Sequence, residues 1–245
     1  MSSLFGQSVA VISPHLDDAV LSLGAALCEA ATAGTDVAVV TVLAGDPAES
    51  CAPTRWDRSA GFRTAGEAAQ RRRQEDARAC ELIGARPVWL PFPYGENRGG
   101  ENRGGLDEDA IWEAVSGVTG NAEAVLLPGF PLTNPDHAWL ASLLLRHRLP
   151  NQRIGLYLEQ PYVRWRKIEQ PYVPEGLERF VGGQLAWKAI EADGAARRLK
   201  RRACHAYASQ VRLLRPRQLS LPLEWRVALY EARAGGETIA WLEDR

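Results

Sequence analysis

The sequence is short of the features that would place it in several large classes of protein. Its four cysteines (Cys28, Cys51, Cys80 and Cys204) are scattered without C-x-x-C spacing. We therefore expect free thiols in a reducing cytoplasm rather than disulfides. No apolar run approaches the roughly 20 residues of a membrane-spanning helix, and no basic region followed by an apolar run indicates a signal peptide. These absences predict a cytoplasmic protein with no membrane span.

An excess of charge of one sign is also missing. Lys and Arg number 29 against 30 Asp and Glu, which gives a net charge of -1 and no whole-chain argument for a nucleic-acid partner. One segment departs from this balance, since Ala195–Arg217 holds eight Lys or Arg and no acidic residue. Three roles are open to it: a solvated helix face, a contact with an anionic substrate or acidic partner, or a phosphate-binding stripe. We expect no nucleic-acid partner.

What is present is an alternation of apolar runs with helical segments. Strands are predicted at Val9–Ile12, Val37–Leu43, Pro87–Phe92, Ala124–Leu127 and Ile154–Glu159, and helices at Ala19–Ala33, Glu67–Ile83, Asp107–Val118 and Ala138–Arg148. Loop is predicted at Gly45–Ala60 and a turn at Pro128–His137. This order is typical of an α/β fold, a Rossmann-like open and mainly parallel sheet with helices on both faces. No G-x-G-x-x-G follows the first strand, which disfavours a dinucleotide-dependent dehydrogenase.

The chain is long enough for one large domain, and we expect residues 1–245 to form it. Residues 1–159 would be the Rossmann-like core, and residues 160–245 would pack on the same sheet, with a basic helix near Ala195–Ser209. A duplicated GENRG at Gly95–Gly99 and Gly100–Gly104 enlarges the loop after the third strand. That loop is either an inserted solvated segment or part of a substrate rim.

The first predicted strand runs directly into SPHLDD, which places His15, Asp17 and Asp18 together. Open α/β sheets bind ligands at the carboxyl ends of their strands, so this turn lies where a site is expected. His15 offers an imidazole nitrogen and Asp18 a carboxylate oxygen. A catalytic zinc ion commonly takes three nitrogen or oxygen ligands and keeps one position for water. A third ligand should therefore come from a neighbouring strand end.

The chain has four histidines, so the search for this ligand is short. His137 lies in TNPDHAW after the fourth strand, in the strand-to-helix position that matches His15. His147 and His205 lie inside predicted helices among basic residues, where surface or packing roles are commoner. By itself His137 would also have a structural role, but with His15 and Asp18 it becomes the third ligand.

Asp17 has two possible roles. Beside a metal-bound water, its carboxylate would take a proton as a general base. Alternatively, Asp17 and Asp18 are the N-cap and first-turn acid of the following helix, a common use of Asp. The adjacent histidine and the second site at His137 favour the catalytic role.

Four segments together resemble a known family. SPHLDDAVLS and NPDH are similar to the two motifs of the LmbE-like/PIG-L zinc-dependent N-deacetylases, usually Pro-His-Pro-Asp-Asp and His-Pro-Asp-His. RRRQEDARACELIGA resembles the family's Arg-x-x-Glu helix, with Arg72 and Glu75. KRRACHAYASQ resembles its Lys-x-x-Ala-x-x-x-Tyr-x-Ser-Gln segment; the matching residues here are Lys200, Ser209 and Gln210. The segments span nearly the whole chain in the family's order.

The resemblance implies a zinc-dependent N-deacetylase, a hydrolase of linear amide bonds that acts on an N-acetylated amino sugar or glycosylated small molecule. His15, Asp18 and His137 would bind Zn²⁺ or another divalent metal. Asp17 would be the general base and later the acid that protonates the leaving amine. Asp136 would orient a neighbouring motif residue by a hydrogen bond.

Two departures from the family pattern bear on the substrate and the mechanism. Leu16 replaces the usual second proline, a change associated with a bacterial subgroup that includes antibiotic-modifying sugar deacetylases. Asn134 stands where histidine is usual; its amide can donate to an oxyanion but carries no titratable proton. Alternatively, the role of Asn134 is structural, and its side chain forms an Asx turn before Pro135.

Three functions thus stay open. Residues on the rim of the site would distinguish sugar deacetylation from amide hydrolysis on a thiol conjugate. The alternatives to sugar deacetylation are an amidase that acts on a thiol conjugate, and a catalytically impaired family member that only binds a ligand. The aromatic residues of the predicted rim loops, which would either stack on a substrate or serve ordinary packing, are Trp56, Phe62, Tyr94, Tyr162, Trp165 and Tyr172.

Overall fold

In the part of the chain that the structure describes, seven strands form one sheet between two layers of helices. The computed structural model describes residues 4–47, 51–93, 106–147, 153–163, 177, 180, 185–211, 213 and 236–242. The strands are β1 (Ser8–Ser13), β2 (Asp36–Thr41), β3 (Arg86–Trp89), β4 (Ala124–Phe130), β5 (Arg153–Leu158), β6 (Lys188–Ile190) and β7 (Glu237–Trp241). The helices are α1 (Asp18–Thr32), α2 (Arg55–Ala60), α3 (Ala65–Ile83), α4 (Glu108–Thr119), α5 (Pro135–His147), α8 (Gly194–Ala206) and α9 (Ala208–Val211).

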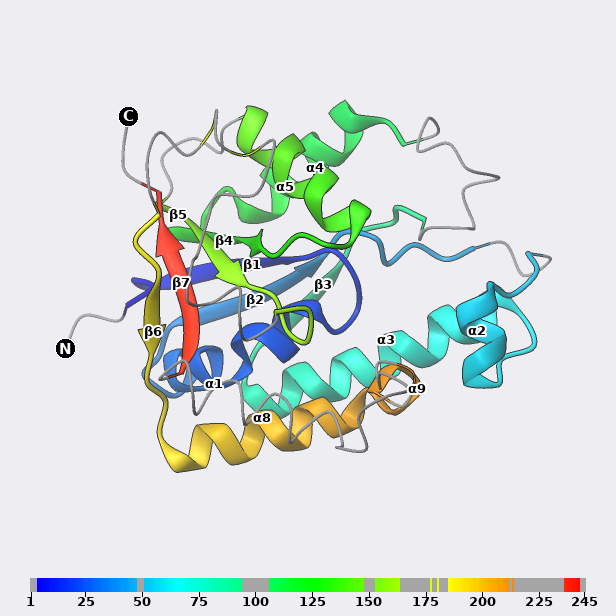
Figure 1. Cartoon of the computed structure of the whole chain (residues 1–245), viewed down its shortest axis with the longest axis horizontal. Coiled ribbons are helices and arrows are strands. Elements are labelled where there is room, and N and C mark those ends of the chain that lie inside the picture. The colour runs from blue at the N-terminus through cyan, green and yellow to red at the C-terminus, as the bar shows by residue number, and fades with distance from the viewer. Residues whose placement is uncertain are drawn as a thin grey trace.

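The sheet has the order β3-β2-β1-β4-β5-β7-β6 (Figure 1). Neighbours from β3 to β5 pair in parallel, and β7 pairs antiparallel with both β5 and β6. The predicted α/β class and mainly parallel sheet are confirmed. The order of strands reverses between β1 and β4, which is the switch point where open sheets of this kind bind ligands.

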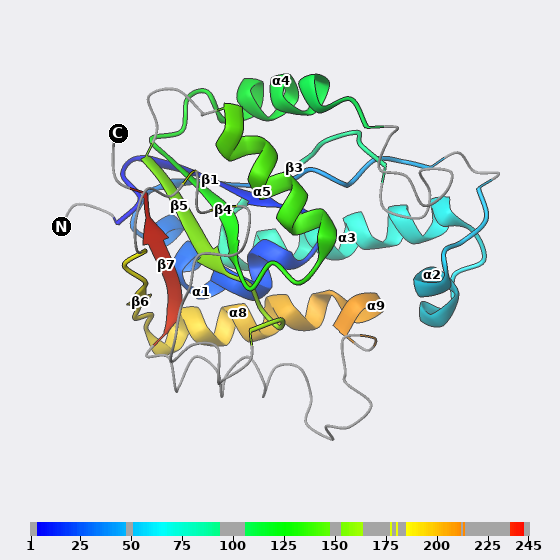
Figure 2. The ribbon, with the colours of Figure 1, turned by 45° about the horizontal axis from the view of Figure 1, so that its top comes forward.

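Apolar residues alternate between the two faces of the sheet. Val9 and Val11 of β1 pack in one buried cluster with α1, α3 and α8, whereas Ala10 and Ile12 pack in a second cluster with α4 and α5. Figure 2 shows the two helical layers on opposite sides of the strands. Both faces of the central strands are covered, which is why these strands read as continuous apolar runs in the sequence.

The C-terminal part of the chain completes this single domain. Strand β7 extends the sheet beyond β5, and α8 packs along α1 and α3. The buried Lys200 of α8 forms an ion pair with the buried Glu237 of β7, and Tyr207 donates a hydrogen bond to Asp76 of α3 at 2.7 Å. Among the described residues after 160, β6 and β7 therefore lie in the same sheet as β1 to β5.

The structure corrects two local predictions. Residues Arg55–Ala60 form helix α2 rather than loop, because Thr54 and Asp57 make a reciprocal capping box at its start. The predicted turn Pro128–His137 is shorter, since β4 runs to Phe130 and α5 already begins at Pro135. The GENRG duplication lies outside the described residues, as do Tyr94, Trp165 and Tyr172.

The structure describes all four cysteines. All four cysteines are free, and three of them are buried. Within the described ranges, none of the helices is long and apolar enough to cross a membrane.

Candidate metal centre and its pocket

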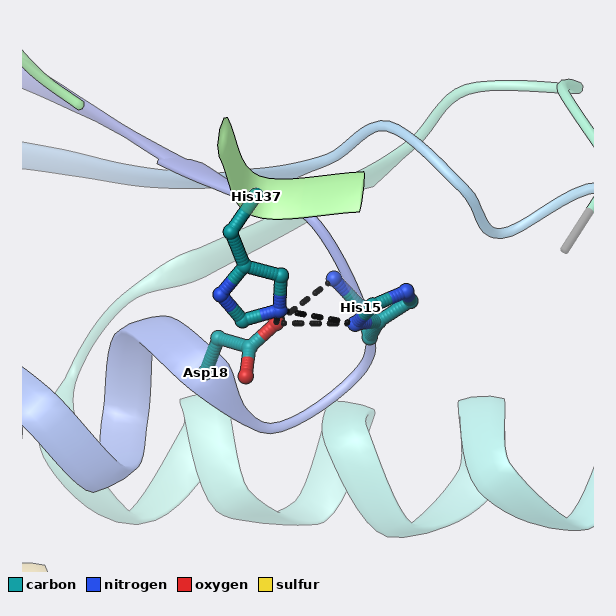
Figure 3. Close-up of side chains that lie close together, drawn as sticks. All are labelled: His15, Asp18 and His137. Atoms are coloured by element: carbon teal, nitrogen blue, oxygen red, sulfur yellow. Dashed lines mark hydrogen bonds and ion pairs between the residues drawn. The ribbon is translucent and has the colours of Figure 1, made fainter. Parts of the chain in front are cut away.

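Two loops meet at the switch point of the sheet. The β1–α1 loop carries His15 and leads into Asp18, and the start of α5 carries His137, which is fully buried. Strands β1 and β4 are direct neighbours, so these distant segments of the chain come together at one edge. Figure 3 shows the three side chains pointing toward one another.

The three candidate ligand atoms form a small triangle. His137 Nε2 lies 3.1 Å from His15 Nδ1 and 3.2 Å from Asp18 Oδ2, and His15 Nδ1 lies 3.2 Å from the same oxygen. Ligand atoms about 2.0–2.1 Å from a tetrahedral zinc ion stand about 3.3 Å apart. Two imidazole nitrogens and one carboxylate oxygen at these separations therefore fit one face of a zinc site with an open fourth position.

Each histidine is held on its far side by another carboxylate. His15 Nε2 lies 3.2 Å from Asp136 Oδ2, and His137 Nδ1 is hydrogen-bonded to Glu159, which is 1% exposed. Such carboxylate–histidine pairs fix ring orientation and direct the other nitrogen at a metal. Sequence reasoning assigned an orienting role to Asp136 but overlooked Glu159. The available signal was its place at the carboxyl end of the predicted fifth strand.

Asp17 occupies the N-cap position of α1, yet its side chain makes no capping hydrogen bond. Ser13 satisfies this helix end instead, because its Oγ accepts the backbone N–H of Ala19 at 3.1 Å. Asp17 also has an unusual backbone conformation, with φ 156° and ψ -30°. Its carboxylate is therefore not used as a cap and lines the pocket beside His15.

The pKa values of the two adjacent aspartates are shifted in opposite directions. Burial, and then the charge of Asp18, raise the pKa of Asp17 well above its ordinary value. Burial also acts to raise the pKa of Asp18, but the charge and hydrogen bond of His137, with those of His15, hold that pKa below its usual range. Although burial opposes it, Asp18 and Glu159 raise the pKa of His137. The site thus stabilises positive charge between its carboxylates, which suits a bound cation.

A cavity of about 170 Å³ opens beside the triangle. It is lined by His15, Leu16, Asp17, Leu43, Ala44, Gly45, Pro47, Trp56, Asp57, Ala65, Ala69, Arg72, Asn134, Tyr162 and Gln210. Tyr162 stands edge-on to the ring of His137, with 5.5 Å between ring centres. Two of the predicted rim aromatics, Trp56 and Tyr162, therefore belong to the cavity. Phe62 lies against Arg72 and in a separate groove.

Asn134 has a definite structural contact in this loop. Its Oδ1 accepts the backbone N–H of Asp136 at 2.9 Å, and its backbone oxygen accepts from His137 and Ala138 at the start of α5. The side chain therefore forms the Asx turn and also lines the cavity. Because Oδ1 is engaged, the NH₂ group is the part of this amide suited to donate toward a ligand.

Of the remaining motif residues, Arg72 and Gln210 line the cavity, whereas Glu75, Lys200 and Ser209 do not. Ser209 donates to Glu75 at 2.7 Å, which joins α9 to α3. His147 stacks on Trp112, and His205 is exposed on α8, so neither histidine approaches the triangle. In the basic segment, Arg197, Arg198, Arg201 and Arg202 are exposed, whereas Lys200 is buried.

Comparison with solved structures places this fold among deacetylases. An A40926 pseudoaglycone deacetylase is 27% identical, with a TM-score of 0.79 over 98% of this chain and 99% of its own. A deacetylase of teicoplanin biosynthesis is 23% identical, with a TM-score of 0.78 over 96% of this chain and 97% of its own. The 4-carboxy-2-hydroxymuconate hydratase of Pseudomonas putida KT2440 is 18% identical, with a TM-score of 0.56 over 98% and 97%.

Sequence comparison gives the family directly. No curated protein matches the chain. The model of the PIG-L family, described as GlcNAc-PI de-N-acetylase, matches residues 10–147, which include the triangle, Asp17, Asn134 and Asp136. The chain belongs to the PIG-L family of de-N-acetylases.

Proposed function

We propose that this protein is a metal-dependent hydrolase that removes the N-acetyl group of an amino sugar, free or in a glycosylated small molecule. The observation that carries the proposal is the triangle of His15, Asp18 and His137, with Asp17 beside it in the same pocket. Family membership supports the reaction, since the family description is a de-N-acetylase of a GlcNAc compound. The amide C–N bond would break as a C–O bond to water forms, giving acetate and an amine.

The metal would be Zn²⁺ or a similar divalent ion held by His15, Asp18 and His137. When bound, it would polarise the amide carbonyl and lower the pKa of a water molecule. Asp136 and Glu159 would hold the two imidazole rings in the orientation in which His15 Nδ1 and His137 Nε2 face each other.

Asp17 would move the protons of this reaction. Its carboxylate would take a proton from the attacking water and return it to the nitrogen of the leaving amine. Three observations support this role: it lines the pocket, it adjoins the ligand Asp18, and it is not used as a helix cap. The amide NH₂ of Asn134, on the same cavity, would donate a hydrogen bond to the oxyanion that develops on the substrate carbonyl.

An amino-sugar substrate, free or within a glycosylated small molecule, agrees with the deacetylases among the structural neighbours. The pseudoaglycone deacetylase shares 27% of its residues over nearly the whole of both chains. The hydratase with the same fold shows why the fold alone does not fix the reaction. The purified protein should therefore be tested directly for the bond that it breaks.

The decisive experiment combines metal analysis with an amine-release assay. We expect about one equivalent of divalent metal, and metal-dependent release of amine and acetate from N-acetylglucosaminyl glycosides. An N-acylated thiol conjugate serves as the second arm. Release from the conjugate alone would favour an amidase, and tight binding without any release would favour a ligand-binding protein.

A further inference from the structure

Trp56 lines the cavity instead of packing in the core. It is partly exposed on the six-residue helix α2, and it belongs to none of the buried apolar clusters found among the described residues. By contrast, Trp112, Trp139, Trp187 and Trp241 all pack against those clusters. Trp89 also lies outside them, but it donates a hydrogen bond to Asp76 and does not line the cavity. A large apolar side chain that does not serve the core, and that lines a cavity beside a metal centre, calls for another explanation.

A buried side chain fixes the plane of this indole. Trp56 Nε1 donates a hydrogen bond to Gln210 Oε1 at 2.8 Å, and Gln210 is only 8% exposed. Gln210 lines the same cavity from α9, 154 residues further along the chain. Because the N–H is used at the edge of the ring, the flat face of the indole is the part that can meet a ligand.

The next residue anchors the helix itself. Asp57 is 1% exposed, completes the capping box with Thr54 and forms an ion pair with Arg72 of α3. Helix α2 is thus attached to α3 through Asp57 and to α9 through Trp56. A one-and-a-half-turn helix would not hold its position by propensity alone, so these two contacts determine where the indole lies.

The surroundings of the indole fit a ring-shaped ligand. Ala65 and Ala69 of α3 line the cavity with small side chains, and His15 and Asp17 line it on the side of the metal centre. A cavity of roughly 150 Å³ accepts a six-membered ring, and this one measures about 170 Å³. One face of a pyranose ring presents C–H groups, which pack on an aromatic face, while its hydroxyl groups point outward.

We propose that Trp56 is the platform on which the apolar face of the substrate's sugar ring rests, and that Gln210 is a positioning residue that sets the plane of the indole. This deepens the proposed function, because it assigns the ring next to the N-acetyl group to a defined part of the same pocket. The aromatic platform selects cyclic over acyclic N-acetyl compounds.

Binding measurements test the platform without relying on turnover. The dissociation constant of methyl N-acetylglucosaminide is measured by ligand-observed NMR for the wild type, Trp56→Phe and Trp56→Ala. We expect Trp56→Ala to weaken binding about 3- to 10-fold and Trp56→Phe to weaken it less, since a smaller aromatic face remains. Acyclic N-acetylethanolamine should bind the wild type and Trp56→Ala equally. No sugar binding by the wild type, or equal sugar binding by Trp56→Ala, would overturn the platform.

A double-mutant cycle tests the role of Gln210. Gln210→Leu removes the acceptor and should raise KM about 2- to 10-fold with a smaller effect on kcat. In the Trp56→Phe background, which has no indole N–H, Gln210→Leu should have no further effect. Additive effects would show that Gln210 does not act through Trp56. Gln210→Glu keeps an acceptor oxygen and should restore the wild-type KM.

Trp139→Phe is the matched control, because it loses an indole hydrogen bond of the same length, 2.8 Å to Glu108, on the opposite face of α5 from His137. It should leave sugar binding unchanged. The experiments also test the deacetylase function and the Trp56 platform independently of each other. Sugar binding that depends on Trp56 without amine release refutes the deacetylase function alone, and amine release with sugar binding that is independent of Trp56 refutes the platform alone.

Discussion

At the scale of single residues, the site depends on the different surroundings of the adjacent residues Asp17 and Asp18. Asp18 points into the triangle and accepts the backbone N–H of His15 at 2.9 Å, whereas Asp17 lines the open pocket. Ser13 accepts a backbone N–H group at the start of α1, so the carboxylate of Asp17 is not needed as the N-cap of this helix. Two carboxylates in sequence thus acquire different environments, which is how adjacent groups take different chemical roles.

Matched substitutions should separate these roles. Asp17→Asn should retain about one equivalent of metal and lose on the order of 10² or more in kcat, because the proposed general base is removed. Asp18→Asn should lose most of the metal together with the activity, because the proposed charged ligand is removed. Metal content by mass spectrometry and initial rates check both. Loss of the ion from Asp17→Asn would move that residue into the ligand set.

Glu159 should act on the metal through His137. Glu159→Gln weakens the hydrogen bond to His137 Nδ1, and we expect metal affinity to fall about 10- to 100-fold, measured by competition with a chromogenic chelator. Glu108→Gln is the control, since Glu108 also accepts a ring N–H, from Trp139, away from the site. If the metal affinity of Glu159→Gln is unchanged, Glu159 has only a structural role. It then stabilises the loop after β4 by accepting the backbone N–H of Leu132 at 2.8 Å.

Asn134 has two possible roles: its NH₂ group donates to an oxyanion, or its Oδ1 atom only forms the Asx turn. Variants that keep or remove the Oδ1 atom distinguish them. Asn134→Asp keeps an oxygen for the turn at Asp136 but loses the donor, whereas Asn134→Ala loses both. If the NH₂ group stabilises the oxyanion, both variants should lose on the order of 10–10³ in kcat, and the Asp variant should keep its melting temperature. Full activity of Asn134→Asp in steady-state assays would leave the Asx turn as the sole role.

At the scale of elements, the C-terminal helix is fixed by buried polar contacts as well as apolar packing. Lys200 and Glu237 are 1% and 3% exposed and pair with each other, and Glu237 also accepts the backbone N–H groups of Ala25 and Ala26 in α1. Glu237 of β7 therefore connects to α8 through the ion pair and to α1 through these hydrogen bonds.

Breaking this pair should be costly because it leaves a buried charge. Lys200→Met should lower the free energy of unfolding by about 3–5 kcal/mol, measured by urea denaturation. The double variant Lys200→Met/Glu237→Gln should recover part of the loss. Arg78→Met breaks the exposed pair with Glu81 and should cost at most about 1 kcal/mol. A Lys200→Met cost no greater than that of Arg78→Met would show that the pair adds no stability.

Elements with a strong local signal could be predicted, and those set by distant contacts could not. The apolar runs gave β1, β2, β4 and β5 within a few residues, because strands covered on both faces need continuous hydrophobicity. Helix α2 was missed although Thr54-x-x-Asp57 is a capping-box pattern, since its anchors at Arg72 and Gln210 are far along the chain. The short β6 was missed for a related reason, since its position depends on pairing with β7.

In the site, too, some features have a local sequence signal and others depend on distant contacts. The grouping of His15, Asp18 and His137 followed from their matching positions at strand ends, which a parallel sheet brings to one edge. The partner of His137 did not follow, because nothing in the local sequence of Glu159 indicates which ring it faces. The Trp56–Gln210 contact joins segments 154 residues apart, so the sequence left Trp56 with two open roles.

At the scale of the whole molecule, the candidate metal centre joins the two halves of the sheet. His15 and Asp18 belong to the half that contains β1, β2 and β3, and His137 belongs to the half that contains β4 and β5. A bound ion would therefore cross-link the halves at the switch point, and its binding energy would add to the stability of the folded domain.

Metal binding should consequently be measurable as stability without any substrate. For chelator-treated protein, Zn²⁺ at 100 times its dissociation constant should raise the free energy of unfolding by about 2.7 kcal/mol. For a chain of this length, that corresponds to roughly 5–10 °C in melting temperature, measured by circular dichroism. His15→Ala removes one proposed ligand and should abolish the rise, while His205→Ala, which changes an exposed histidine on α8, should keep it. An equal rise in His15→Ala would place the stabilising ion elsewhere on the protein and would remove the metal from the switch point.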